Sequence, residues 1–166
     1  MKLRPRILLR LERQKIHIQV VGQSEALTED AVLAVNITSR KVVGVGTGAL
    51  SWKGMADFQT VWPFEHPRVI VDDWDAARFL LTELIARTCP RNILKPEVVL
   101  QVVTPLEGGL CPIEKRALLQ LLEAAGANEG VVFESDTIPT PTMIDELFRS
   151  THQSAATVSA LYRKNV

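Results

Sequence analysis

The spacing of apolar residues changes near residue 73, and this change limits the folds that the chain can adopt. Before it, apolar and polar residues alternate at 6–12 (RILLRLE) and 15–22 (KIHIQVVG), and β-rich runs follow at 31–37 (AVLAVNI) and 42–46 (VVGVG). Short runs of this kind with turn residues between them are typical of strands. The first part of the chain is therefore predicted to form an antiparallel meander.

Two segments of this first part lack a strand pattern. Residues 23–30 are polar and are expected to connect two strands. The stretch ALSWKGMADF at 49–58 is compatible with a short helix, and Pro63 and Pro67 predict irregular structure at 60–67. No strand is therefore expected in these segments.

Beyond residue 73 the apolar residues follow a helical period. Five of them share one face at helical spacing, namely Ala77, Leu80, Leu81, Leu84 and Ile85. Either Asp72 or Asp73 can cap the start of this helix. The run PEVVLQVVTP at 96–105 is almost continuously apolar and lies between prolines, which is typical of a strand buried on both faces.

The remaining sequence repeats the helix–strand–helix pattern. Pro112 suits the first position of a second helix, and Gly126 suits its end. The segment VVFES at 131–135 is predicted to be a short strand, and residues 141–166 are mostly compatible with a helix. The expected order is thus a meander followed by α-β-α-β-α.

This order of elements predicts the fold class. Strand–helix–strand units impose right-handed parallel crossovers, so the later strands are expected to join the meander in a mixed sheet. The result is the ribonuclease-H-like layout of α/β proteins, which RNase H, actin, sugar kinases and Hsp70-type ATPases share. Because this layout hosts both nucleases and ATPases, the function has to be inferred from particular residues.

Composition and charge restrict the partners and the compartment. The 166 residues fit one domain, and 19 basic residues balance 19 acidic ones. No net charge therefore attracts nucleic acid or anionic lipid. No apolar run approaches the roughly 20 residues of a membrane span, and the start, MKLRPR, lacks the apolar part of a signal peptide. We predict a cytoplasmic protein with no nucleic-acid partner and no integral membrane segment.

Six segments occur in an order that is found in a known family. They are ILLRLERQKIHIQV, EDAVLAV, KVVGVG, RVIVDDWDAARFLL, IEKRALLQLLEAAGA and VVFES. Through most of residues 7–136 they resemble the MreB/Mbl family of bacterial actins. That family has a DLGTANT-like phosphate loop, segments like EPSVVAI, KVLAVG and GVIADF, and a VERRA helix that ends in AGA.

The resemblance implies a domain organisation. Residues 1–166 would form a single actin-type domain I, an actin-like half domain with a small peripheral region at about 47–68. Residues 137–166 would form a divergent helical C-terminal segment. The family's second phosphate loop, typically DLGGGT, and its adenosine-binding motif have no room in this chain.

The resemblance also implies that the phosphate loop is degenerate. By ungapped placement the family's loop Asp falls on Arg10, its Gly on Glu12 and its Thr on Arg13. A glycine lets backbone N–H groups approach a phosphate, whereas the carboxylate of Glu12 would repel it. Arg10 and Arg13 can bind an anion directly or pair with nearby acids, and we favour pairing.

The family's two acidic positions at the start of its later helix fall on Glu134 and Ser135. The second of them orients water in the family, and Ser135 lacks the carboxylate. With the altered loop, this predicts no catalytic residues, no ATP hydrolysis, no bound cofactor and no metal.

Other chemistry finds little support. A nuclease would need carboxylates inside two strands to hold metal ions, and 96–105 has none in its interior. The spacing of GVGTG is not that of a dinucleotide-binding loop. The histidines His17, His66 and His152 are scattered, and Cys89 and Cys111, which lie in no metal-ligand spacing, are predicted to be reduced thiols.

Four aromatic residues gather in the predicted peripheral region. They are Trp52, Phe58, Trp62 and Phe64. Exposed aromatic residues often mark a binding surface. The alternative, which we favour slightly, is that they form a small local core.

The combined prediction is a non-catalytic, MreB-like interaction protein that acts through protein–protein contacts. Its expected partners are a second copy of itself or an MreB-like filament, which would make it an accessory of the cytoskeleton or of cell shape. The alternative is a nucleotide-binding protein that retains ATP affinity through a modified loop or at a dimer interface.

Overall fold

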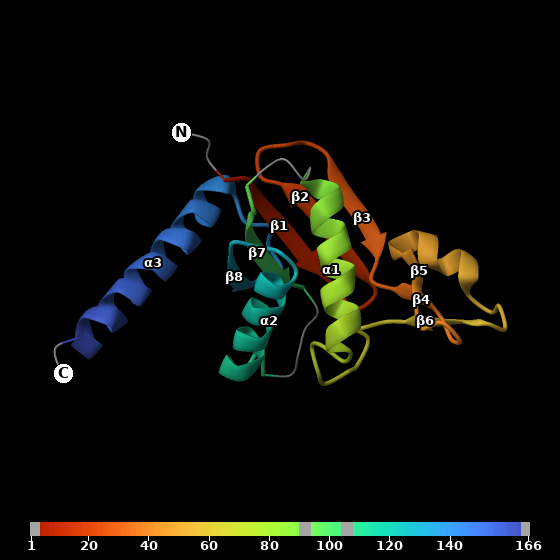
Figure 1. Ribbon diagram of the computed structural model, residues 1–166. Coiled ribbons are helices and arrows are strands. Elements are labelled where there is room, and N and C mark those ends of the chain that lie inside the picture. Colours follow the sequence, from red (N-terminus) through yellow and green to blue (C-terminus); the bar gives the residue numbers. More distant parts are fainter. Residues whose placement is uncertain (1–3, 90–93, 104–107, 164–166) are drawn as a thin grey trace. The chain divides into compact units, whose positions relative to one another are not determined.

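The protein consists of two compact units, residues 1–135 and 136–166. The structure is a computed structural model that describes residues 4–89, 94–103 and 108–163 (Figure 1). The described part of the first unit contains all the observed strands, and the described part of the second contains one helix.

A five-stranded mixed sheet organises the first unit. Its order is β3-β2-β1-β7-β8. The strands are β1 (Arg6–Leu11), β2 (Lys15–Val20), β3 (Ala26–Asp30), β7 (Glu97–Val102) and β8 (Glu129–Glu134). The first three are antiparallel, whereas β7 is parallel to both β1 and β8. The predicted α/β class, with later strands added beside a meander, is confirmed.

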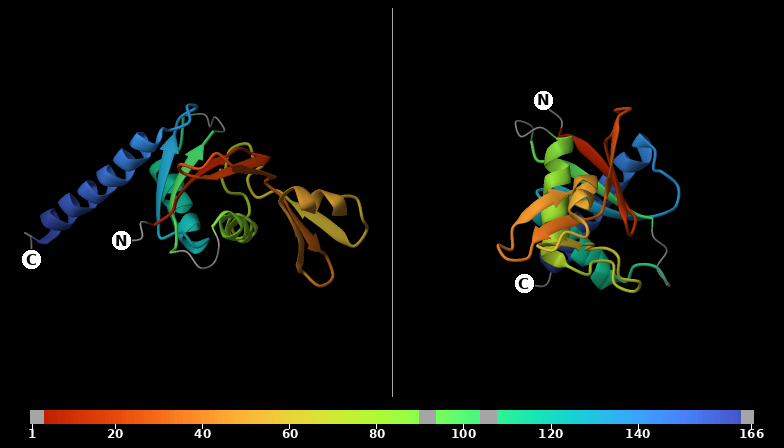
Figure 2. Two further views of the ribbon diagram at one scale, coloured as in Figure 1. Left: turned by 90° about the horizontal axis from the view of Figure 1, so that it is seen from above. Right: turned by 90° about the vertical axis from the view of Figure 1, so that its right-hand side faces the viewer.

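Two helices, α1 (Trp74–Thr88) and α2 (Pro112–Ala124), lie on the same side of this sheet (Figure 2). The main core lies between them and the sheet. It includes Leu9, Ile16, Leu100, Leu81 and Leu118, each at most 1% exposed. Alternate positions of β1 and β2 face this core, as their alternating sequence predicts.

The helix ends follow local rules that the sequence makes visible. The Asp73 carboxylate accepts a hydrogen bond from the Ala76 N–H at 3.0 Å and caps α1. Pro112 occupies the start of α2, and the Glu114 side chain accepts from the Cys111 N–H at 2.8 Å. Gly126 follows α2 with a φ of 104°. Both predicted helices of this unit are confirmed.

The meander does not continue as one sheet. A second, three-stranded sheet of order β5-β4-β6 contains β4 (Leu33–Asn36), β5 (Val42–Val45) and β6 (Phe58–Val61). The short helix η1 (Gly46–Trp52) connects β5 to the segment before β6. In Figure 1 this small sheet is labelled β4, β5 and β6, and it is coloured orange to yellow together with η1.

Two expectations for this region were wrong. Residues 26–30 form the edge strand β3, although their sequence is polar, because they pair with β2 and bury little of their surface. Residues 58–61 form β6 because they pair with β4, and the irregular structure begins only near Pro63.

The second unit contains α3 (Pro141–Arg163). Pro141 starts the helix, and the Thr140 hydroxyl accepts a hydrogen bond from the Met143 N–H at 3.3 Å. The predicted C-terminal helix is confirmed. Among the described residues, no helix combines the length and the apolar character that crossing a membrane would require.

Candidate functional site

The C-terminal ends of β1, β7 and β8 meet at one edge of the large sheet because these strands are parallel. This edge contains the residues that the resemblance places in the phosphate loop and at the water-orienting position. Arg10 lies beside Gln101 in the register of β1 and β7, and Gln101 lies beside Phe133 of β8. The edge is therefore the candidate site.

Arg10 is joined to the neighbouring strands through a buried glutamine. Its Nε donates to Oε1 of Gln101 at 3.1 Å, and Nε2 of Gln101 donates to the carbonyl oxygen of Ser135. Gln101 is fully buried, and it is the one buried polar side chain among the residues that the structure describes. A buried amide needs such partners, so this chain of bonds ties Arg10 to the protein.

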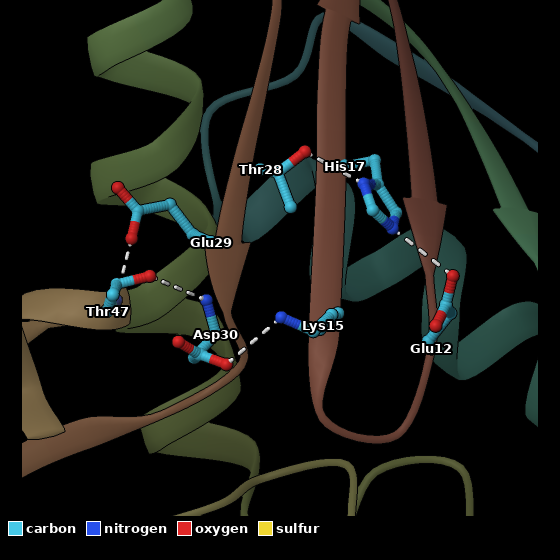
Figure 3. Close-up of polar contacts among 7 residues, drawn as sticks. All are labelled: Glu12, Lys15, His17, Thr28, Glu29, Asp30 and Thr47. Carbon is cyan, nitrogen blue, oxygen red and sulfur yellow. Dashed lines mark hydrogen bonds and ion pairs between the residues drawn. The ribbon is translucent and has the colours of Figure 1, made fainter.

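Glu12 is the first member of a second polar chain, which Figure 3 shows. Its carboxylate lies 3.2 Å from Nε2 of His17, and Nδ1 of His17 lies 2.9 Å from the Thr28 hydroxyl. A carboxylate can only accept, so Nε2 of His17 donates to Glu12, while Nδ1 pairs with the Thr28 hydroxyl. The Glu12 side chain thus stabilises the pairing of β1, β2 and β3.

Arg13 and Gln14 form the two-residue turn between β1 and β2, which the bond from the Glu12 N–H to the Lys15 carbonyl closes at 2.9 Å. Nη2 of Arg13 donates to the Pro67 carbonyl at 3.4 Å, and Nε2 of Gln14 donates to Glu65 at 2.8 Å. The turn therefore contacts the segment that leads to α1. Arg10, Glu12 and Arg13 each have a different partner and do not converge on one point.

Glu134 connects the end of β8 to the start of α2. Its carboxylate accepts from the Leu110 N–H at 2.8 Å and pairs with Nζ of Lys115 at 2.6 Å. The Leu110 N–H first, and Lys115 second, lower the pKa of Glu134 below its ordinary value. Ser135, the neighbouring position, contributes its backbone carbonyl to Gln101.

Because folding lowers the pKa of Glu134, the free energy of unfolding depends on pH in the acidic range. The folded state binds the proton less readily than the unfolded state, so this contribution is complete above the ordinary carboxyl range and is lost as the pH falls through the lowered pKa. Urea unfolding between pH 6 and pH 3 is expected to show a shallower loss of stability in Glu134→Gln than in the unmodified chain. Glu25→Gln, at an exposed position, should leave the slope unchanged.

The four aromatic residues of the predicted interface separate into different environments. The rings of Trp52 and Phe58 lie 4.4 Å apart at 48°. Trp52 and Trp62 are partly buried against the small core of Val32, Ala34 and Ala49. Phe64, in contrast, is 2% exposed and belongs to the main core. Phe64 therefore offers no surface to a partner.

Sequence reasoning missed a junction between the two sheets and α1, part of which Figure 3 shows. The Glu29 carboxylate of β3 accepts from the Thr47 N–H at 2.6 Å and lies 3.4 Å from Arg87 of α1. The Asp30 N–H donates to the Thr47 hydroxyl at 3.3 Å. The sequence feature that could have indicated this junction is the adjacent acidic pair Glu29 and Asp30, because a loop that only joins two strands does not require it.

The cysteines differ in reactivity. Burial raises the pKa of the Cys89 thiol, whereas Cys111 is exposed, and both are free. We expect a maleimide to label Cys111 about ten-fold faster or more than Cys89 in the folded protein. Mass spectrometry of peptides after short labelling measures both rates, and Cys111→Ser should retain only the slow reaction. Equal rates would contradict the burial of Cys89.

The part of the chain that the structure describes contains no group of three or more histidine, cysteine or acidic residues that could hold a metal ion. Asp72, Asp73 and Asp75 cluster at the start of α1, where Asp73 acts as the cap. The candidate site is thus a set of side chains that bond mainly to the protein itself.

The mixed sheet, its crossover helices and the small second sheet define the class of protein, half of an actin-like fold. The profile of the MreB/Mbl protein family matches residues 7–140, so the chain belongs to the MreB/Mbl family. No curated protein matches the chain.

Solved structures agree with this assignment. The crystal structure of MreB5 of Spiroplasma citri bound to AMPPNP has a TM-score of 0.66 and 27% identity, over 81% of this chain and 39% of that one. A non-polymerising MamK mutant bound to AMPPNP has a TM-score of 0.63 and 17% identity, over 81% of this chain and 42% of that one. A MamK double helical filament has a TM-score of 0.57 and 17% identity, over 78% and 41%.

These likenesses differ in what they support. At 17% identity the MamK structures show the fold alone. The chain spans about two fifths of the length of the solved structures that it matches. The predicted actin-like half fold and family are confirmed.

Proposed function

We propose that this chain is a non-catalytic, MreB-like interaction protein that acts in the cytoplasm through protein–protein contacts, as an accessory of the cytoskeleton or of cell shape. The observation that carries the proposal is the β1–β2 turn, which stands where the family's phosphate loop would be. Glu12 places a carboxylate there, and Arg10 is bonded to Gln101. A turn of this kind is suited to holding strands together.

The backbone of the turn supports the same conclusion. Phosphate-binding loops use successive N–H groups that point into one concavity, which requires a residue in the left-handed region or a glycine. Of the described residues other than glycine, only Arg40 has a positive φ. The turn at 12–15 therefore lacks the conformation that gathers N–H groups around an anion. At Ser135 the water-orienting carboxylate is absent as well.

The proposed partners are a second copy of the chain or an MreB-like filament. The support is membership of the MreB/Mbl family. Trp52 of η1, Phe58 of β6 and Trp62, which follows β6, form the proposed contact surface, since each remains partly exposed. Light scattering on the purified chain and a pull-down with MreB test this, and a strict monomer that does not bind MreB would refute it.

A second function, binding of ATP without hydrolysis, is favoured by one observation. Arg13 is partly exposed on the turn, and its hydrogen bond to the Pro67 carbonyl oxygen is long, at 3.4 Å. Its guanidinium has further donors for a phosphate group. A thermal shift with ATP and Mg²⁺ that Arg13→Ala removes would favour this second function over the first.

A further inference from the structure

An open groove lies beside β6, at the edge of the small sheet. Its volume is about 470 Å³. The lining residues are Gln59, Thr60, Val61, Trp62, Glu65, His66, Asp72 and Asp73. Successive side chains of a strand point to opposite faces, so a cavity that touches three consecutive residues of β6, Gln59 to Val61, lies along the edge of the strand.

The alternation of hydrogen bonds between β4 and β6 shows which backbone groups of β6 face this groove. The sheet order β5-β4-β6 places β6 at an edge, and no described strand pairs with its outer side. The Ile37 N–H donates to the Asp57 carbonyl, and the register pairs Val35 with Gln59. In an antiparallel pair, alternate residues bond to the neighbour. Thr60 therefore directs its N–H and carbonyl away from β4, toward the groove.

Phe58 and Trp62, which also direct backbone groups away from β4, already form local hydrogen bonds. The Phe58 N–H donates to the Met55 carbonyl at 3.1 Å, and the Trp62 carbonyl accepts from the Glu65 N–H at 3.4 Å. The pair of groups on Thr60 is thus the place where an added strand can form a backbone hydrogen-bonded ring.

The groove is acidic. Three carboxylates line it, those of Glu65, Asp72 and Asp73, and no lysine or arginine does. Glu65 accepts one bond from Gln14, and Asp73 accepts one from the Ala76 N–H, so both retain acceptor capacity. Nδ1 of His66 accepts from the Val69 N–H at 3.1 Å. A basic segment is the complementary ligand.

We propose that the free edge of β6 binds an extended, basic peptide segment of a partner protein as an added strand. Backbone bonds to Thr60 would fix the segment, and its lysine or arginine side chains would reach Asp72, Asp73 and Glu65. This inference rests on the proposed function and names the chemistry of the partner. Pairing of β6 with β6 of a second copy is disfavoured because it would bring two acidic walls together.

The test uses the full chain and a fluorescent, acetylated nine-residue peptide that alternates valine with lysine. Two control peptides replace every lysine by glutamate, or the central valine by proline. Fluorescence anisotropy at low salt should show saturable binding of the first peptide only. The proline peptide keeps the charge and loses strand pairing, so equal binding of that peptide would overturn the added-strand proposal.

Variants of the chain locate the binding. Thr60→Pro removes the outward N–H that an added strand would bind, so it should abolish binding. The variant is expected to fold, because proline is tolerated where a strand N–H faces solvent. Asp72→Asn should weaken binding about two- to five-fold, whereas Glu25→Gln, at an exposed position far from β6 in sequence, should not. If Thr60→Pro fails to fold, Asp72→Asn and the salt dependence of binding decide the question.

The outcomes separate this inference from the proposed function. If both variants bind the lysine peptide as tightly as the unmodified chain, the peptide does not bind at β6. If sedimentation shows a dimer that Asp72→Asn strengthens, a second copy of the chain and not a basic peptide occupies this edge. Either result would overturn the proposed peptide site. Neither result would affect the claim of a non-catalytic protein. Hydrolysis of ATP by the chain would refute that claim and leave the peptide site in place.

Discussion

Replacing Phe64 by alanine is expected to lower the free energy of unfolding by about 3–5 kcal/mol. The ring is 2% exposed and packs in the main core, so its removal leaves a cavity that the surroundings cannot fill. Phe58, six residues earlier, is only partly buried and contacts Trp52. Phe58→Ala should cost about half as much or less, because its site is open to solvent.

Urea unfolding of the two variants, followed by circular dichroism, measures both losses. The same variants also address partner binding, since Phe58→Ala should weaken association while the folded fraction of Phe64→Ala should associate normally. Equal costs for the two substitutions would contradict the assignment of Phe64 to the main core.

Gly46→Ala is expected to destabilise the protein by about 2–4 kcal/mol, from the left-handed backbone and a lost charged hydrogen bond. Gly46 has a φ of 67°, and a Cβ there would overlap Oε2 of Glu29. The carboxylate would have to move and would lose its bond to the Thr47 N–H and its pair with Arg87. The junction between the two sheets would loosen as a result.

A double-mutant cycle separates the two causes. In a Glu29→Ala background, Gly46→Ala should cost less, because only the backbone strain remains. Gly48→Ala is the matched control, since its Cβ would meet nothing within 4 Å, and it should change stability by less than about 0.5 kcal/mol. Identical costs in both backgrounds would show that Glu29 does not contact Gly46.

The elements that the sequence predicted well are those whose signals are local. Helix α1 shows five apolar residues on one face and an acidic cap, and β7 shows an apolar run between prolines. These patterns arise from burial against the core and do not depend on which distant segment provides it. The mixed sheet followed from the order of such elements and from the handedness of crossovers.

The elements that the sequence did not predict depend on distant partners. Strand β3 is polar because it lies at an edge, and only its pairing with β2 makes it a strand. The separate small sheet requires β4 to pair with β6 across η1. The burial of Phe64 could not be predicted either, because a single apolar residue in a proline-rich segment is part of no periodic pattern.

The candidate site could be located from the sequence but not described in detail. The degenerate loop positions followed from the resemblance, whereas the bonds of Arg10 to Gln101 and of Glu12 to His17 required the strand register. A glutamine inside an otherwise apolar strand was the one visible signal, since a buried amide needs a partner.

Isothermal titration calorimetry of the chain with ATP and Mg²⁺ most directly tests the claim that the β1–β2 turn does not bind nucleotide. We expect no saturable heat at micromolar to millimolar ATP, because the turn at Arg10, Glu12 and Arg13 holds strands and does not gather donors around a phosphate. MreB5 of Spiroplasma citri, solved with AMPPNP, is the positive control. A clear micromolar response that Arg13→Ala abolishes would contradict the claim.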